Sequence, residues 1–428
     1  MLVRIALYRV LQKPFLDVLY LHPNKYAQLN YLLCPLCLFT VMHMNEIQNP
    51  FHPGFGVAPT VFVGRQDIVQ RVDRALANPN GGDPYLKVVA RAHRGTGKTV
   101  LLDELGDSAL SKGWVVVTTE AGSTDTSLTS RILIEIQRAI ESNNPNPRRR
   151  LSNVSLSLPV IGGGFGVDLK QENELQASSL LETCRRFFAY GASLPVAPSG
   201  LFLSIDEIHD ADPLDLRTIG NTLQLLERQG HSIALAMAGL PDPNQTAGPT
   251  FLARCQHLHL AALSATEVAD GLRETAATAG KTWAGEAITE AIGACSGYPY
   301  MMQLVGYQSF DTAVSAEITV EDVREGVAAA LVQLSESVLA GLPRQLSTIE
   351  QRFLYAMAVD EEAEPTRIAD VAKRTGQDGS HVNVYRDRLI KAGLIVPLGR
   401  GLIGFAIPGH RTQLRTTDGY LHFIDSLP

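Results

Sequence analysis

The sequence predicts an α/β protein with a parallel sheet, followed by a helical region and a small domain of three helices and a hairpin. Four short apolar runs alternate with helical patterns, and continuous apolar strands separated by helices are typical of a parallel sheet covered on both faces. Strand patterns stop at Ser264, and a separate pattern begins after residue 345. The apolar runs are residues 85–90, 114–119, 201–205 and 233–238.

The length of 428 residues exceeds one ordinary core, so we expect several domains. The formal net charge of −7 means that any contact with nucleic acid needs a local basic face. Five cysteines, an odd number, argue against a disulfide framework and favour a reducing cytoplasm. The expected segments are an extension at 1–47, a core at 48–262, a helical region at 263–344 and a C-terminal domain at 345–428.

The first 43 residues differ from the rest, being rich in Leu and Tyr. Residues 31–44 are apolar but are broken by Pro35 and are shorter than the roughly 20 residues that span a bilayer, so we expect no membrane partner. Cys34 and Cys37 form a CxxC pair without a second pair, so half of a zinc site is missing. We interpret this segment as an extension upstream of a natural start at Met44; an interfacial anchor is the alternative.

The elements of the sheet domain follow in order after a lead-in at 49–59, where prolines exclude a helix. Residues 151–158 alternate with period two before Gly162, Gly163 and Gly164, which predicts a hairpin insertion up to Leu169. The preceding Arg148–150 run is either a phosphate-contacting patch or a solvated loop. Helices are expected at 98–110, 128–140 and 214–228, and a fifth strand at 257–260.

The sequence pattern after the sheet predicts helices only. Ser264 and Glu267 have the spacing of a capping box, which marks a helix start. A sheet domain followed by a helical one predicts a cleft between them. Further helices are expected at 286–294, 299–313 and 320–342.

The strongest motif is the run of residues 92–99, Ala-His-Arg-Gly-Thr-Gly-Lys-Thr, between a strand and a helix. This is the Walker A spacing, in which backbone amides and a helix N-terminus cradle phosphate. It predicts that Lys98 meets the β- and γ-phosphates and that Thr99 binds Mg²⁺. The predicted ATP-contacting loop is Arg94, Gly95, Thr96, Gly97, Lys98, Thr99 and Val100.

A second motif, residues 200–207, is an apolar strand that ends in two acids. This Walker B form assigns Asp206 to Mg²⁺, paired with Thr99, and Glu207 to the attacking water. His209 completes an Asp-Glu-Ile-His tetrapeptide, but no companion helicase motif is evident, so we expect His209 to lie at the surface or behind the site.

With these motifs the chain resembles AAA+ P-loop ATPases of the origin-recognition and STAND-like kinds. The resemblance covers about residues 60–345 and includes the box at 61–65, Val-Phe-Val-Gly-Arg. It implies that Phe62, Val63 and Gly64 border the adenine. Gln66 replaces the usual acid of this box, and no polar sensor side chain is evident at 238–241.

Two more residues take roles from the resemblance. Arg254 lies where the family's arginine finger is usual, implying a homo-oligomer in which it acts in trans; capping of its own helix is the alternative. The run Gly297-Tyr298-Pro299-Tyr300 resembles a GxP motif, which implies that Pro299 lies near the adenine. The departures from the motor pattern favour a slow, switch-like ATPase.

The C-terminal pattern resembles a winged helix-turn-helix. Helices are expected at 347–357, 366–375 and 380–391, and a wing at 394–406 around a Gly-Arg-Gly turn. In a DNA-binding version the third helix and the wing would contact duplex DNA. The residues concerned are His381, Asn383, Arg386, Lys391 and Arg400.

Two functions follow from this organisation. In the first, nucleotide state controls a winged helix that contacts DNA. In the second, a STAND-like signalling ATPase uses the winged helix for autoinhibition or for contact with an unidentified protein partner. A nucleotide-binding protein that barely hydrolyses ATP is a third reading, which turnover of wild type against Glu207→Gln distinguishes.

Overall fold

The fold is described from a computed structural model of the chain. The structure describes residues 48–54, 56–122, 126–141, 169–241, 250–334, 346–361 and 364–427. The expected N-terminal extension, the Arg148–150 patch and the hairpin at 151–168 lie outside these residues. None of the helices that the structure describes is long and apolar enough to cross a bilayer.

A five-stranded parallel sheet forms the first part of the fold, in the order β2-β3-β4-β1-β5. The strands β1, β2 and β4 are rich in β-branched or small apolar residues and β3 in large apolar ones, as expected for a sheet buried on both faces. The order places β4 between β1, which leads into the Walker A loop, and β3, which ends in Asp206. The strands are β1 (Lys87–Arg91), β2 (Val115–Glu120), β3 (Leu201–Asp206), β4 (Ile233–Gly239) and β5 (Gln256–Leu258).

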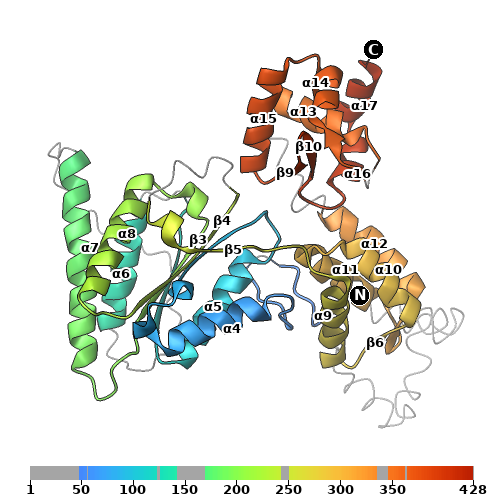
Figure 1. Cartoon of the computed structure of the whole chain (residues 1–428). Coiled ribbons are helices and arrows are strands. Elements are labelled where there is room, and N and C mark those ends of the chain that lie inside the picture. Colours follow the sequence, from blue (N-terminus) through green and yellow to red (C-terminus); the bar gives the residue numbers. More distant parts are fainter. Residues whose placement is uncertain are drawn as a thin grey trace, which may run out of the picture. The chain divides into compact units, whose positions relative to one another are not determined.

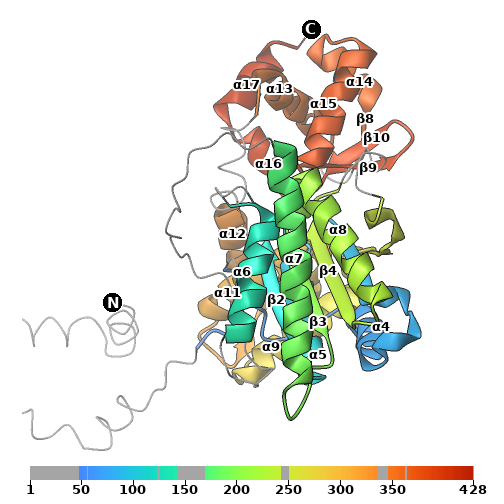
Figure 2. The ribbon, with the colours of Figure 1, turned by 90° about the vertical axis from the view of Figure 1, so that its left-hand side faces the viewer.

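Helices cover both faces of this sheet (Figures 1 and 2). Successive residues of β1 illustrate the division, since Val88 packs with α4 and α5 while Val89 packs with α6, α7 and α8. The parallel sheet thus has the two-sided cover that its sequence predicts. The helices are α4 (Gln66–Ala77), α5 (Lys98–Ser111), α6 (Leu128–Glu141), α7 (Leu169–Ala192) and α8 (Pro213–Arg228).

The helix α7 corrects the sequence analysis, which assigned Leu169 to a hairpin and gave no range for a helix between this hairpin and β3. The first half of α7 is polar in sequence, and an apolar pattern of helical spacing begins only at Leu180 and continues through Cys184 and Phe187. All three of these side chains are buried against α6 and the sheet. Tertiary packing of the second half therefore determines a helix that local pattern alone does not reveal.

The helical region has its own core of buried side chains. The predicted capping box at Ser264 and Glu267 is present at the start of α9. The expectation that strands stop at Ser264 is wrong, because β6 and β7 form a two-residue parallel pair that is too short to show a period in sequence. The elements are α9 (Ala265–Thr278), β6 (Thr282–Trp283), α10 (Gly285–Cys295), α11 (Pro299–Thr312), β7 (Glu317–Ile318) and α12 (Val320–Leu334).

The C-terminal part packs helices against a three-stranded sheet in the order β8-β10-β9. The helix expected from Thr366 begins instead at Ile368, because Thr366 and Arg367 pair with β10. Two short helices, α16 (His410–Arg415) and α17 (Asp418–Asp425), were not predicted. The other elements are α13 (Thr348–Ala358), β8 (Thr366–Arg367), α14 (Ile368–Thr375), α15 (Gly379–Lys391), β9 (Ile395–Gly399) and β10 (Leu402–Phe405).

Candidate functional site

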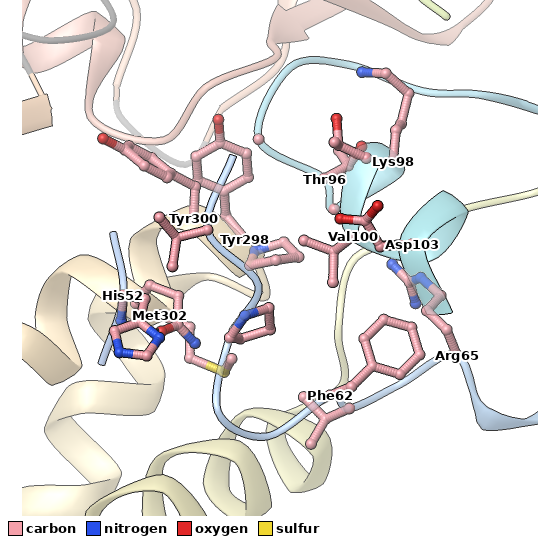
Figure 3. A pocket seen from close by; sticks show the side chains of 18 of the residues that line it. His52, Phe62, Arg65, Thr96, Lys98, Val100, Asp103, Tyr298, Tyr300 and Met302 are labelled. Carbon is pink, nitrogen blue, oxygen red and sulfur yellow. The ribbon is translucent and has the colours of Figure 1, made fainter. Parts of the chain in front are cut away.

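A cavity of about 460 Å³ lies between the loop that follows β1, the lead-in segment and the helical region. Four parts of the chain that are distant in sequence form its walls, since Glu207 after β3 also lines it, so the fold is needed to assemble the cavity. Figure 3 shows Lys98 and Thr96 at one end, and His52, Met302 and Phe62 toward the other. The lining residues are His52, Gly54, Gly56, Val57, Pro59, Val61, Phe62, Val63, Arg65, Arg94, Gly95, Thr96, Gly97, Lys98, Thr99, Val100, Asp103, Glu207, Leu263, Tyr298, Pro299, Tyr300, Met302 and Gln303.

The loop between β1 and α5 has the backbone geometry that its glycines predict. Gly95 and Gly97 have φ values of +71° and +84°, which are strained for residues with a side chain. Lys98 is buried, and its Nζ donates to the carbonyl oxygen of His93 at 2.9 Å. Burial lowers the pKa of Lys98, while the carboxylates of Glu207 and Asp206 act in the opposite direction. An ammonium group held by a carbonyl oxygen is ready to exchange that partner for a phosphate oxygen.

The hydroxyl of Thr99 and the carboxylate of Asp206 converge below this loop. Thr99 Oγ1 donates to Asp206 Oδ2 at 2.6 Å, although the two residues come from α5 and from the end of β3. Hydroxyl and carboxylate oxygens are hard ligands, and Mg²⁺ is usually bound by few protein groups together with substrate phosphates. No cluster of three or more His, Cys, Asp or Glu side chains with metal-site geometry occurs among the described residues. The pair therefore fits a magnesium ion that is shared with a nucleotide.

Glu207 follows Asp206 in a strained backbone conformation with φ +53°. Its Oε2 is buried and makes no hydrogen bond within the described part of the chain, although His209 Nδ1 lies 3.2 Å away. His209 Nδ1 also faces the backbone N–H of Leu240 at 3.4 Å. Backbone strain of this kind is typical of functional sites, and a carboxylate oxygen without a partner can orient a water molecule.

The helical region contacts the phosphate loop directly through the turn that begins α11. Tyr298 Oη donates to the carbonyl oxygen of Arg94 at 3.0 Å, and the backbone N–H of Tyr300 donates to that of Gly95 at 3.2 Å. Burial is the main reason that the pKa of Tyr298 is raised above its usual range, so the hydroxyl stays a donor. The turn therefore donates hydrogen bonds to two carbonyl oxygens of the loop, which would otherwise repel a phosphate.

The lead-in segment is anchored on α11 rather than on the sheet. Phe51 is fully buried in the core of the helical region and packs against Gly306, where an added Cβ would lie 2.3 Å from the Phe51 ring. Asn49 Nδ2 donates to the carbonyl oxygen of Tyr307 at 2.9 Å. The prediction that this segment contains no helix is confirmed, but its role as a cavity wall was missed. A proline-rich composition does not indicate which other part of the fold a segment packs against.

Most of the predicted nucleotide contacts line the cavity, with the exceptions of Gly64, Arg254 and Asp206. Gly64 supports the turn before α4, where an added Cβ would lie 2.3 Å from Leu263. Arg254 is exposed at the end of η5 (Leu252–Arg254), outside the residues that line the cavity. Asp206 contacts the site through Thr99. Sequence reasoning missed Arg65, Asp103, Gln303 and the tyrosines of the turn at α11, because they belong to no phosphate motif.

The residues expected to contact DNA lie on α15 and on the turn between β9 and β10. His381, Asn383, Lys391 and Arg400 are exposed. Arg386 is half-buried, and it donates to Asp387 Oδ1 through Nε at 2.9 Å and to Asn383 Oδ1 through Nη1 at 2.9 Å. Part of the expected positive charge is therefore neutralised within the helix itself.

The comparisons with known proteins agree with this geometry in the sheet domain. Residues 61–235 match the family model of the AAA ATPase domain. The chain contains an AAA ATPase domain. Its parallel sheet and phosphate loop are those of the α/β P-loop NTPase fold. Residues 336–412 match a domain of unknown function (DUF8462), and no curated protein matches by sequence.

Several solved structures have low sequence identity to the chain. Cdc6p from Pyrobaculum aerophilum has 17% identity and a TM-score of 0.47, with 87% of this chain and 97% of that chain covered. Orc1 from Aeropyrum pernix, solved in complex with DNA, has 14% identity and a TM-score of 0.45, with 90% and 97% covered. The RuvB Holliday junction branch migration motor from Thermotoga maritima has 14% identity and a TM-score of 0.43, with 86% and 97% covered.

Proposed function

We propose that the protein is a slow ATPase that binds ATP with Mg²⁺ in this cavity and uses its nucleotide state as a switch. The observation that carries the proposal is the convergence of Lys98, Thr99 and Glu207 on one cavity, with Thr99 hydrogen-bonded to Asp206. The AAA ATPase domain match over the same residues supports it. In this proposal residues 48–262 form the core, 263–344 a lid, and 345–428 a winged-helix domain.

The polar groups of the two Walker motifs each have a role in the proposed hydrolysis of ATP. The amides of the loop and Lys98 bind and orient the β- and γ-phosphates. Thr99 and Asp206 hold Mg²⁺, which neutralises charge on the phosphates when it is bound. Glu207 Oε2 orients a water molecule toward the γ-phosphate. Arg254, which is outside the cavity, acts only if a second copy of the chain presents it.

The decisive experiment is steady-state ATP hydrolysis by wild type and by Glu207→Gln. Since the amide retains the shape of Glu207 but is a poor base, we expect turnover to fall at least about 100-fold while ATP affinity stays within a few-fold. Lys98→Ala should lower ATP affinity severely, because the phosphates lose their main positive partner. Equal turnover in Glu207→Gln would contradict the assignment of Glu207, and unchanged affinity in Lys98→Ala would contradict the site.

For the C-terminal domain we propose contact with duplex DNA through α15 and the wing. Lys391, Arg400 and His381 are exposed on these elements, as backbone-contacting residues must be. Nucleotide state would then control how firmly the domain holds DNA. ATP turnover measured with and without duplex DNA tests this link, and stimulation by DNA is the expected result.

A specific observation favours the second candidate, a signalling ATPase whose winged helix contacts protein. Val384 on α15 and Leu398 on β9 expose 48% and 54% of their surfaces, and apolar side chains of this kind gain from a protein partner more than from phosphate. Asp387 also neutralises Arg386. Turnover that is indifferent to DNA, together with tight ATP binding, would favour this candidate.

A further inference from the structure

A buried glutamine lies among the apolar residues of α11 at the wall of the cavity. Gln303 has 7% of its surface exposed, and the residues next to it in sequence, Met301, Met302, Leu304 and Val305, are buried as well. An amide that is buried to this extent needs hydrogen bonds on both of its polar atoms, because each unsatisfied atom costs stability.

Within the described residues, one of the two polar atoms of Gln303 has a partner and the other has none. The backbone N–H of His52 donates to Gln303 Oε1 at 3.0 Å. This contact fixes the orientation of the amide, since a backbone N–H requires an acceptor. Gln303 Nε2 is then a fixed donor, and it is buried without a hydrogen bond among the residues that the structure describes.

The location of Gln303 matches the base of a nucleotide rather than its phosphates. His52, which Gln303 contacts, lies toward the end of the cavity away from Lys98 (Figure 3). The cavity wall also carries apolar side chains suited to a flat ring, namely Val57, Phe62, Val63, Leu263 and Met302. A single oriented donor in an apolar wall is the kind of group that gives a site its specificity.

A structural role alone explains only half of this arrangement. Gln303 Oε1 ties the lead-in segment to α11, but that role leaves Nε2 unsatisfied at a cost that a purely structural residue would avoid. We propose that Gln303 recognises the base of the nucleotide. In this proposal its Nε2 donates a hydrogen bond to a ring nitrogen of the adenine of bound ATP. The inference rests on the proposed ATP site and assigns its base specificity to one residue.

The test compares ATP with tripolyphosphate, which lacks the base, in titrations of wild type, Gln303→Leu and Gln303→Glu. Gln303→Glu keeps an acceptor for the N–H of His52 but removes the donor. We expect both variants to bind ATP about ten-fold more weakly, the loss of about one hydrogen bond, and to bind tripolyphosphate like wild type. Leu304→Met, a change of similar volume at a buried residue of α11 that does not line the cavity, serves as the control with nearly unchanged ATP affinity.

The contacted atom is identified with 1-deaza-, 3-deaza- and 7-deaza-ATP, in each of which one ring nitrogen becomes a C–H. For one analogue we expect wild type and Gln303→Leu to bind equally, because the acceptor is missing. Equal ATP affinity in wild type and both variants would overturn the proposal. A loss of affinity in the variants that is equal for ATP and tripolyphosphate, or equal for ATP and all three analogues, would overturn it as well. Wild type that binds neither ATP nor tripolyphosphate would instead refute the proposed ATP site itself.

Discussion

The tyrosine hydroxyl at the start of α11 supports the phosphate loop at the scale of a single residue. Tyr298→Phe removes the hydrogen bond to the carbonyl oxygen of Arg94 while keeping the ring. We expect ATP affinity to fall about five- to ten-fold, since a hydrogen bond contributes about 1 kcal/mol. Titration with a fluorescent ATP analogue measures the change. Tyr307→Phe is the control, because it removes a hydroxyl from α11 outside the residues that line the cavity; an equal loss in both variants would contradict the role of the Tyr298 hydroxyl.

Single residues could be predicted where chemistry fixes their spacing. Lys98 and Thr99 follow from the phosphate loop, and Asp206 meets Thr99 as the two motifs together predict. Gln303 and Tyr298 could not be found this way, because their contacts join residues more than 200 positions apart. Nothing in the local pattern of α11 distinguishes a glutamine at a cavity wall from one in solvent.

At the scale of elements, the sequence pattern predicts the helices and strands that carry an apolar face of their own. The five strands of the sheet lie within a few residues of their predicted positions, and so do α5, α6 and α8. The elements that were missed depend on partners elsewhere in the fold. Thr366 and Arg367 pair with β10, and the beginning of α7 has no apolar pattern of its own.

The basic residues of α15 and the wing carry a prediction at this scale. The double variant Lys391→Ala with Arg400→Ala should weaken duplex DNA binding and lower the slope of log K against log salt by about 2, one for each lost phosphate contact. Fluorescence anisotropy at several salt concentrations measures this slope. Arg217→Ala with Arg228→Ala, on the exposed face of α8, removes the same charge elsewhere. An equal slope in both double variants would contradict a DNA contact through α15 and the wing.

At the scale of the whole molecule, buried histidines couple stability to pH. Burial is the main reason that the pKa of His93 and that of His410 are lowered to about 4. In the unfolded chain a histidine has a pKa of about 6.5, so as pH falls the unfolded state takes up these protons first. The stability that comes from keeping each histidine neutral is therefore complete above about pH 6.5 and is lost progressively toward pH 4.

His410 offers the clearest test of this coupling, because it is almost fully buried at the start of α16, its Nδ1 makes no hydrogen bond within the described ranges, and its ring packs against Phe405. Between pH 7 and pH 5 wild type should lose about 2 kcal/mol of unfolding free energy through this residue, at about 1.4 kcal/mol for each pKa unit. His410→Leu should lack that part of the loss. Urea unfolding followed by circular dichroism at the two pH values measures the difference. An identical loss in wild type and His410→Leu would mean that the His410 ring becomes protonated in the folded protein without cost, and that other groups set the acid limit.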